Sequence, residues 1–300
     1  MSNSHAKRFT FSTFRAARVT GEKVSMLTCY DYTTAKLMQE AGVQILLVGD
    51  SAANVILGHN STIPISLDFL IELTAAVKRG APNCLVVGDM PFGSYHESVA
   101  QGVKNITNMV KLSGCDCVKI EATASHLKLI RQAADAGVAV MAHLGLRPQS
   151  VGILGGYKIA GRTADEAMAI VELAVQMQEA GAASILLEAV APEVAEAVVQ
   201  ATNVPVIGCG AGPACHGSVV VMHDIAGLTA QPPRFAPRMG DLAAPMKEIF
   251  AEYATRIAKG EYPAAEQQYE MPADERAKFL RRRFEAERSK HQPPEVSGPW

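Results

Sequence analysis

The sequence predicts an α/β protein that folds as a closed (β/α)8 barrel. Short runs of Val, Ile and Leu, bounded by glycine and polar residues, recur along the chain and are typical of strands buried on both faces. Helical patterns separate these runs, as in repeated βα units. The chain has 300 residues and 48% hydrophobic content, which suits a single barrel of this kind. A doubly wound open sheet is the alternative topology.

The expected strands follow one another between residues 24 and 222. They cover residues 24–29, 45–49, 84–88, 117–121, 138–142, 184–187, 205–208 and 219–222. Several of them stop at an ionisable residue. Because the strands of such a barrel run parallel, these ionisable residues are expected to meet at one mouth.

Capping residues mark where the helices between the strands begin. Thr33 is expected to cap a helix that stops at Gly42, because glycine adopts the left-handed conformation that ends many helices. Ser66 is expected to cap a helix that runs to about residue 80, and Thr163 a longer one that follows a glycine-rich loop. Three more helices are expected at 97–113, 124–136 and 192–201.

The two ends of the chain differ in character from the barrel. In residues 1–21, Phe9, Phe11 and Phe14 alternate, which predicts an edge strand or an arm that packs on a neighbour. Residues 241–259 have the pattern of an amphipathic helix, and residues 273–290 carry interspersed charges of both signs, as a solvated helix does. The sequence thus predicts one barrel domain over 1–265, with its N-terminal arm, and a charged helical extension with a loose tail over 266–300.

Composition argues against several classes of protein. A formal net charge of −2 gives no field that would attract nucleic acid or an acidic membrane. No apolar run approaches the roughly 20 residues of a membrane span, and basic residues interrupt the N-terminus where a signal peptide would be apolar. The six cysteines lack metal-binding spacing and lie in or beside apolar runs, which favours buried, reduced thiols. We therefore expect a cytoplasmic protein with neither a nucleic-acid nor a membrane partner.

Acidic residues follow three neighbouring strands of the predicted barrel. Asp50, Asp89 and Glu121 stand at the ends of the second, third and fourth strands. Because barrel active sites lie at the C-terminal ends of strands, these carboxylates are expected to converge. A divalent ion bound by a few carboxylates, with positions left to water and substrate, is the Mg2+ pattern, and such an ion polarises a carbonyl oxygen. Capping of helix N-termini is the alternative role for each carboxylate.

Three more ionisable residues are expected at the same mouth. Lys119 lies two residues before Glu121, hence on the same inward face, where it needs a carboxylate or an anionic substrate as partner. His143 is a candidate to donate a hydrogen bond to a developing oxyanion, or else a satisfied core histidine. Glu188 ends a strongly apolar run and is a candidate general base, or else forms a salt bridge in a loop. The cluster predicts proton abstraction next to a metal-chelated carbonyl, after which the enolate attacks an electrophile.

Glycine-rich residues 208–212 give a weaker signal. Loops after the seventh and eighth strands of barrels often bind anions, but these glycines also permit tight turns. The chain has no P-loop, no GxGxxG after its first strand and no GxSxG, so nucleotide binding and nucleophile-elbow chemistry have little support.

Several stretches, taken together and in order, resemble the ketopantoate hydroxymethyltransferase family. The resemblance spans about residues 9–262 and rests on MLTCYDY (26–32), VGDS (48–51), LGHNSTIP (57–64), GDMPF (88–92), VKIE (118–121), HLGLRPQS (143–150), GGYK (155–158), GR (161–162), LE (187–188), GAG (210–212) and MHD (222–224).

The resemblance implies a Mg2+-dependent (β/α)8 enzyme of the phosphoenolpyruvate mutase and isocitrate lyase superfamily. Family members transfer a hydroxymethyl group from 5,10-methylenetetrahydrofolate to 3-methyl-2-oxobutanoate, which gives 2-dehydropantoate for pantothenate and coenzyme A. They form large homo-oligomers, often decamers, so a homo-oligomer is expected here. By motif, the resemblance implies Asp50, Asp89 and Glu121 for the metal, Ser51 and Lys119 for the keto acid, and Glu188 as the proton acceptor. With the strand-end reasoning above, the expected site also has Asp50 and Asp89 beside the substrate and Lys119 and His143 in catalysis.

The chain departs from the family pattern at a few positions. The family usually has Asp where this chain has Asn60, and a helical His in the stretch where this chain has Glu72 and its neighbours. It usually has Gly-Gly where this chain has Ala122-Thr123, and Asp-Gly-Gln where this chain has His216-Gly217-Ser218. These positions are expected on loops above the barrel, where they would affect the one-carbon donor or the keto acid. A related metal-dependent lyase or mutase acting on another 2-oxo acid is therefore the alternative. A scaffold or nucleic-acid binder that uses the 276–290 helix is a third hypothesis.

Overall fold

The structure, a computed structural model, describes residues 8–154, 156 and 159–290. It separates into two compact units, Met1–Leu242 and Ala243–Trp300. All of the described strands belong to the first unit, and the described part of the second unit contains only helices and loops. The boundary that the sequence predicts, at residue 265, falls inside the second unit.

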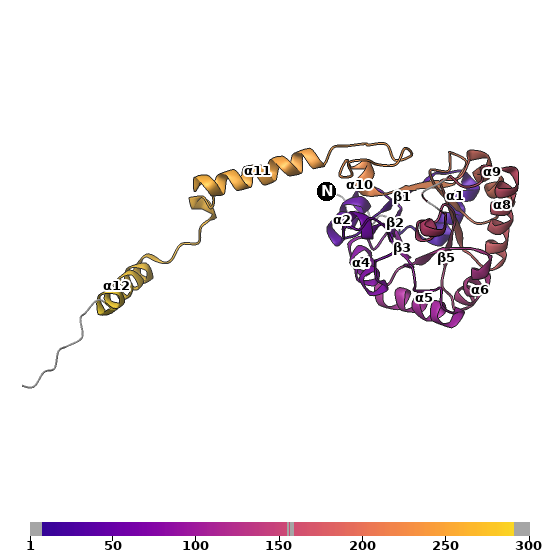
Figure 1. The fold of residues 1–300 in the computed structure, drawn as a ribbon. Helices are drawn as coiled ribbons and strands as arrows, with labels where there is room; N and C mark the ends of the chain where they lie inside the picture. The colour runs from indigo at the N-terminus through magenta and orange to yellow at the C-terminus, as the bar shows by residue number, and fades with distance from the viewer. Residues whose placement is uncertain (1–7, 155, 157–158, 291–300) are drawn as a thin grey trace, which may run out of the picture. The chain divides into compact units, whose positions relative to one another are not determined.

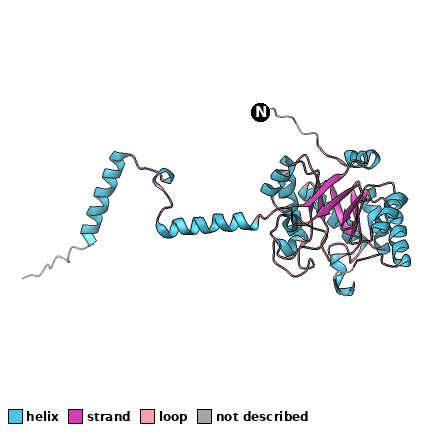
Figure 2. Ribbon diagram, turned by 90° about the horizontal axis from the view of Figure 1, so that it is seen from above, coloured by secondary structure: helices cyan, strands magenta, loops and turns pink. Residues whose placement is uncertain are grey.

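Within the described residues, eight parallel strands close into one barrel in the order of the sequence (Figure 1). The helices of this unit surround the strands (Figure 2). The predicted (β/α)8 barrel is confirmed, and the open-sheet alternative is wrong because β8 pairs with β1. The strands are β1 (Val24–Thr28), β2 (Ile45–Val48), β3 (Leu85–Asp89), β4 (Cys117–Glu121), β5 (Val140–Gly145), β6 (Ser184–Glu188), β7 (Val206–Cys209) and β8 (Gly217–Val220).

The helices of the barrel unit begin largely where capping residues predict. Ser66 and Thr163 each accept a hydrogen bond from the third residue of their helix, as expected. The predicted Thr33 cap is wrong. Asp31 is the extended residue before the helix and accepts from the Thr34 N–H, whereas Thr33 already lies inside it. The helices are α1 (Phe11–Thr20), α2 (Tyr32–Glu40), α3 (Ala52–Val55), α4 (Leu67–Gly80), α5 (Val99–Ser113), α6 (Leu127–Asp135), α7 (Val151–Leu154), α8 (Ala164–Glu179), α9 (Pro192–Ala201) and α10 (Met222–Ile225), with short 3-10 turns η1 (Ala124–His126) and η2 (Pro148–Ser150).

The described part of the N-terminal segment contains a helix, so the predicted edge strand is wrong, and the alternative of an arm that packs on a neighbour stays a prediction. Thr10 caps α1, and Gly21 ends it with a φ of 78°, a left-handed conformation that suits glycine. Phe14 is fully buried and belongs to the same apolar cluster as the residues inside the barrel. The alternating phenylalanines therefore belong to a helix and the residues just before it. Phe9 and Phe11 are partly buried and pack against the same cluster as Phe14.

The inward face of several strands changes from apolar to ionisable toward the C-terminal end. Side chains two residues apart on a strand share a face. Cys117, Met141 and Leu186 lie in the apolar interior, and the next residues on their faces are Lys119, His143 and Glu188. Strand alternation thus carries ionisable groups into the C-terminal layer of the barrel, where Lys119 and His143 are buried.

The second unit contains α11 (Ala243–Lys259), η3 (Ala265–Gln267) and α12 (Ala273–Lys290). Both predicted helices are confirmed. Along its described length α11 has no buried residue, and its large apolar side chains are exposed, including Ile249, Phe250 and Tyr253. Among the described helices of the whole chain, none combines the length and apolar character that crossing a membrane requires.

Candidate active site

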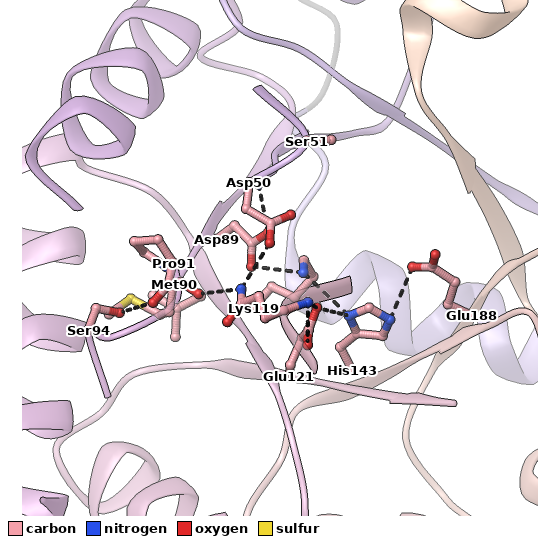
Figure 3. A network of polar contacts seen from close by, with 12 residues as sticks. Asp50, Ser51, Asp89, Met90, Pro91, Ser94, Lys119, Glu121, His143 and Glu188 are labelled. Atoms are coloured by element: carbon pink, nitrogen blue, oxygen red, sulfur yellow. Dashed lines mark hydrogen bonds and ion pairs between the residues drawn. The ribbon is translucent and has the colours of Figure 1, made fainter. Parts of the chain in front are cut away.

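A buried ion pair joins two neighbouring strands at the C-terminal end of the barrel. Asp89 of β3 lies beside Lys119 of β4 in the strand register, and Lys119 Nζ is 2.8 Å from Asp89 Oδ1. The Asp89 side chain is 0% exposed and the Lys119 side chain 5%. The backbone N–H of Asp50, just after β2, donates to Asp89 Oδ2 at 2.9 Å, so the two aspartates are held side by side (Figure 3).

A second group of contacts continues from Lys119 across the barrel. Lys119 Nζ lies 3.4 Å from His143 Nδ1, and His143 Nε2 lies 3.2 Å from Glu188 Oε2 (Figure 3). Burial and the Lys119 charge lower the pKa of His143, which is therefore neutral at pH 7. Since the ammonium faces Nδ1, the imidazole proton is placed on Nε2, toward Glu188. The ring thereby orients the Glu188 carboxylate, and the predicted contact between His143 and an oxyanion stays a prediction.

The site contains more negative than positive charge. Burial raises the pKa of Asp89 to about 7, with the charge of Lys119 opposing the rise and that of Asp50 adding to it. Burial likewise raises the pKa of Glu121 to about 8. Burial alone would lower the pKa of Lys119, but the three carboxylates raise it instead, so the ammonium stays charged. One ammonium against three buried carboxyl groups leaves the cluster short of a cation.

Gln149 connects these carboxyl groups and is not among the predicted site residues. Its Nε2 donates to Asp50 Oδ2 at 3.0 Å and to the Met90 carbonyl at 3.1 Å. Its Oε1 accepts from the Tyr95 hydroxyl at 3.0 Å, and its backbone N–H donates to the Glu121 carboxylate at 3.1 and 3.2 Å. The one sequence signal that pointed to Gln149 is its place in the HLGLRPQS stretch after β5. No local pattern shows that its side chain turns inward.

The candidate metal ligands form a pair rather than a closed cage. In the part of the chain that the structure describes, no three or more His, Cys, Asp or Glu side chains are grouped to hold a metal ion. Asp50 and Asp89 lie together, while Glu121 accepts from Gln149 and lies 3.9 Å from His143. Buried Asp89 Oδ1 has no hydrogen bond within the described residues, although Lys119 is near. Two adjacent carboxylates are the donor set of an ion that keeps water and substrate ligands.

A cavity of about 1650 Å3 opens beside this cluster. Ser51 and Glu188 line it, and Ser51 Oγ lies 2.8 Å from the Tyr30 hydroxyl. The other predicted site residues do not line the cavity and are buried: Asp50, Asp89, Lys119, Glu121 and His143. Gly210 and Gly212 of the glycine-rich loop also line it, with φ values of 65° and 82°. All seven predicted residues thus belong to one end of the barrel.

The departures from the family pattern are not all above the barrel, so that expectation is wrong. His216 precedes β8, at the opposite end from the site, where its Nδ1 accepts from the Val206 N–H. Ser218 lies within β8 and Glu72 within α4. Of the departing positions, Asn60 and Ala122 follow the C-terminal ends of their strands. Residues 155, 157 and 158 of the GGYK stretch lie outside the described residues.

The fold and this cluster define an α/β-barrel enzyme with its ionisable groups at the C-terminal strand ends. Solved structures of similar fold are a phosphonopyruvate hydrolase in complex with oxalate and Mg2+, and a 2,3-dimethylmalate lyase of the PEP mutase/isocitrate lyase superfamily. The first has a TM-score of 0.58 at 16% identity and covers 92% of this chain and 99% of that one. The second has a TM-score of 0.53 at 15% identity and covers 91% and 98%. These likenesses concern the fold.

The sequence comparisons are more specific. The family described as ketopantoate hydroxymethyltransferase matches residues 8–265. A 3-methyl-2-oxobutanoate hydroxymethyltransferase of Hyperthermus butylicus is 43% identical over 265 residues, which cover 88% of this chain and 92% of that protein. One of Clostridium novyi is 41% identical over 258 residues, covering 86% and 94%. The chain belongs to the ketopantoate hydroxymethyltransferase family and is an enzyme, as its resemblance to that family predicts.

Proposed function

We propose that this enzyme transfers a hydroxymethyl group from 5,10-methylenetetrahydrofolate to 3-methyl-2-oxobutanoate and releases 2-dehydropantoate. The observation that carries the proposal is the placement of Glu188 at a cavity wall, beside a buried cluster of carboxylates and one ammonium. The names of relatives about 40% identical over nearly their whole length support hydroxymethyl transfer to this keto acid. The product feeds pantothenate and coenzyme A synthesis in organisms that have that pathway.

Mg2+ fits the residues present. Asp50 and Asp89 would hold it, because they are adjacent oxygen donors in a cluster with a deficit of positive charge. When bound, the ion would polarise the keto oxygen of the substrate and stabilise the enolate. Glu121 accepts from the Gln149 N–H, and the Gln149 side chain donates to Asp50, so Glu121 would act on the ion through these contacts. This differs from the complete three-carboxylate set expected from the family.

The chain's own residues supply the rest of the chemistry. Lys119 would hold the carboxylate or keto oxygen of the 2-oxo acid, because its ammonium is the one cation that the described residues place inside this cluster. Ser51 would add a hydroxyl donor at the cavity wall. Glu188 would take the proton from the carbon next to the keto group, with His143 Nε2 fixing the direction of its carboxylate.

The size of the cavity supports a second, larger substrate. About 1650 Å3 exceeds the volume of a five-carbon keto acid many times, and ligand cavities for drug-sized molecules span roughly 300–1,000 Å3. A reduced folate is a molecule of that larger class. The cavity wall that includes Ser51 and Glu188 would then bring the one-carbon unit to the enolate carbon.

A direct product assay tests the proposal. Enzyme, 3-methyl-2-oxobutanoate and 5,10-methylenetetrahydrofolate are incubated with Mg2+, and 2-dehydropantoate is measured by mass spectrometry. Omission of either Mg2+ or the folate should abolish product. Turnover of a 2-oxo acid that needs no folate would favour the alternative, a metal-dependent lyase or mutase, whose likeness here rests on fold alone.

We further propose a cytoplasmic homo-oligomer with small-molecule substrates. All six cysteines are free thiols, as is usual in a reducing compartment. Exposed apolar residues along α11 (Ile249 at 65%, Phe250 at 61% and Ile257 at 46%) support burial against further copies of the chain. In α12, Lys278 and Arg283 pair with acidic residues of the same helix, which argues against a nucleic-acid surface. Light scattering of the intact protein measures the oligomeric mass.

A further inference from the structure

Asp224 is a buried carboxylate that the chemistry above leaves unused. It lies in α10, just after β8, and is 6% exposed. Within the described residues its side chain takes part in no hydrogen bond and no ion pair, yet it lines the same cavity as Ser51 and Glu188. Its oxygens are not among the described polar atoms that are enclosed without a partner, so they reach the space of the cavity. A ligand that donates hydrogen bonds from inside the cavity would supply the missing partner.

Backbone hydrogen bonds fix the turn of helix that carries Asp224. The first residue of α10, Met222, donates its backbone N–H to Thr28 Oγ1 of β1 at 3.0 Å. The Asp224 N–H donates to the Val221 carbonyl, which closes the turn after β8. The charge of Asp224 raises the pKa of both Tyr30 and Cys209, so its carboxylate lies near these two side chains. Burial is the main cause of both shifts.

Two cationic side chains line the exposed part of the same cavity. Arg162 and Arg234 line it and are exposed, and neither guanidinium has a hydrogen-bond or ion-pair partner among residues 8–154, 156 and 159–290. Phe235 lies next to Arg234 and packs on Gly210, where an added Cβ would come within 2.7 Å of its ring. Much of the remaining wall is apolar, with Val55, Leu146, Ile159, Val190 and Val194. Asp224 is thus the buried carboxylate of this wall, whereas the two guanidinium groups are exposed, as is the carboxylate of Glu193.

We propose that Asp224 binds the 2-amino-4-oxopyrimidine edge of the reduced pterin of the one-carbon donor, and that Arg162 and Arg234 bind its glutamyl carboxylates. This inference rests on the proposed function and assigns the direction in which the donor enters. The pterin edge presents two adjacent N–H groups, which match the two oxygens of a carboxylate, and arginine forms the same paired contact with a carboxylate. The apolar wall between them suits the aromatic middle of the molecule. Charge repulsion from Asp224 disfavours the reverse orientation.

Equilibrium binding of two ligands to the full-length protein tests both ends. Tetrahydrofolate carries the pterin and the glutamyl tail, whereas 6-methyltetrahydropterin carries the pterin alone. Asp224→Asn should weaken binding of both ligands about tenfold or more, the loss expected for hydrogen bonds to a charged group. The double variant R162A/R234A should weaken tetrahydrofolate by a similar factor and leave 6-methyltetrahydropterin within twofold. Glu193→Gln, which removes another carboxylate of the same cavity from an exposed position, is the matched control and should leave both ligands within twofold.

The outcomes separate this inference from the proposed function. If the wild-type protein binds tetrahydrofolate and Asp224→Asn binds it equally well, the assignment of Asp224 is wrong while the donor stands. If both arginine substitutions affect 6-methyltetrahydropterin as strongly as tetrahydrofolate, the orientation is wrong. If the wild-type protein binds 3-methyl-2-oxobutanoate but no folate, the proposed donor falls and this inference with it. Should Asp224→Asn fail to fold, the wild-type protein should still prefer tetrahydrofolate over its 2-desamino analogue by about tenfold; equal affinity would overturn the proposal.

Discussion

Replacing Glu188 by glutamine removes the proposed base while preserving the shape of the side chain. Glu188 ends β6, its backbone carbonyl accepts from the Leu146 N–H at 2.8 Å, and its side chain is 18% exposed at the cavity. The His143 Nε2–H that lies 3.2 Å from Oε2 can still donate to the amide oxygen of glutamine. The fold and the buried Asp89–Lys119 pair should therefore be unaffected, and only the ability to accept a proton is lost.

The expected loss follows from the usual contribution of a positioned base. General acid–base catalysis contributes about 10^2- to 10^4-fold, which corresponds to roughly 2.7–5.4 kcal/mol of barrier. Because His143 keeps its partner and Lys119 keeps Asp89, little of this loss should come from disorder. Exchange of the C3 proton of 3-methyl-2-oxobutanoate for deuterium, followed by NMR under conditions in which the wild-type enzyme exchanges it, should slow by at least about 100-fold in Glu188→Gln.

Two controls accompany this measurement. Mg2+ affinity should change by less than about threefold, because the ligands that we propose are on β3 and after β2 and Glu188 is not one of them. Glu193→Gln, which neutralises an exposed carboxylate of the same cavity, should exchange the proton at the wild-type rate. Exchange in Glu188→Gln within tenfold of the wild-type rate would refute Glu188 as the base, whatever the effect on overall turnover.

Three further predictions concern the buried cluster and its support. Lys119→Met leaves Asp89 without its ion-pair partner in a fully buried position. The free energy of unfolding, measured in urea at pH 8, should therefore fall by about 3–5 kcal/mol, and K119M/D89N should recover much of this loss. A loss below about 1 kcal/mol would contradict the ion pair. Gly145→Ala should destabilise the fold by about 2 kcal/mol or more and slow C3 exchange, because Gly145 has φ +89° and an added Cβ would come within 2.4 Å of the Glu188 carbonyl oxygen. Wild-type stability would show this strain to be absent. Asp89 and Glu121 have folded pKa values of about 7 and about 8, above the value of roughly 4 for unfolded carboxyl groups. Their protonation therefore stabilises the metal-free fold. This stabilisation is complete below about pH 4 and is lost as the pH rises through the folded pKa values of about 7 to 8. Mg2+ should therefore raise the melting temperature more at pH 8.5 than at pH 6, and an equal rise at both would contradict the assignment.

The sequence predicted the parts of the site that depend on a repeating local pattern. Apolar runs ending in Asp89, Glu121 and Glu188 gave strands whose C-terminal ends carry carboxylates, and the two-residue period put Lys119 on the same face as Glu121. Parallel strands in one barrel then require these ends to meet. For this reason the barrel and the members of the cluster could be stated without coordinates, together with helix starts such as Ser66 and Thr163.

Other features could not be predicted because they depend on how loops fold over the strand ends. Gln149 is one polar residue in a loop, and its contacts to Asp50 and Glu121 join residues far apart in the chain. The alternation of Phe9, Phe11 and Phe14 fitted a strand, but docking over the barrel interior selected a helix. His216 lies at the end of the barrel away from the cluster. Its position depends on where β8 begins in the strand register, and no local pattern marks it.

By itself, then, the chain's sequence determined which elements form and which ionisable side chains stand at strand ends, because burial, alternation and capping act over a few neighbouring residues. Only the closed barrel decided which of those side chains touch. Closure places Lys119 between Asp89 and His143, turns His143 toward Glu188, and leaves Asp224 buried with no partner among the described residues. These pairings set the charges and pKa values of the site, and they depend on distances between residues that the sequence separates by tens of positions.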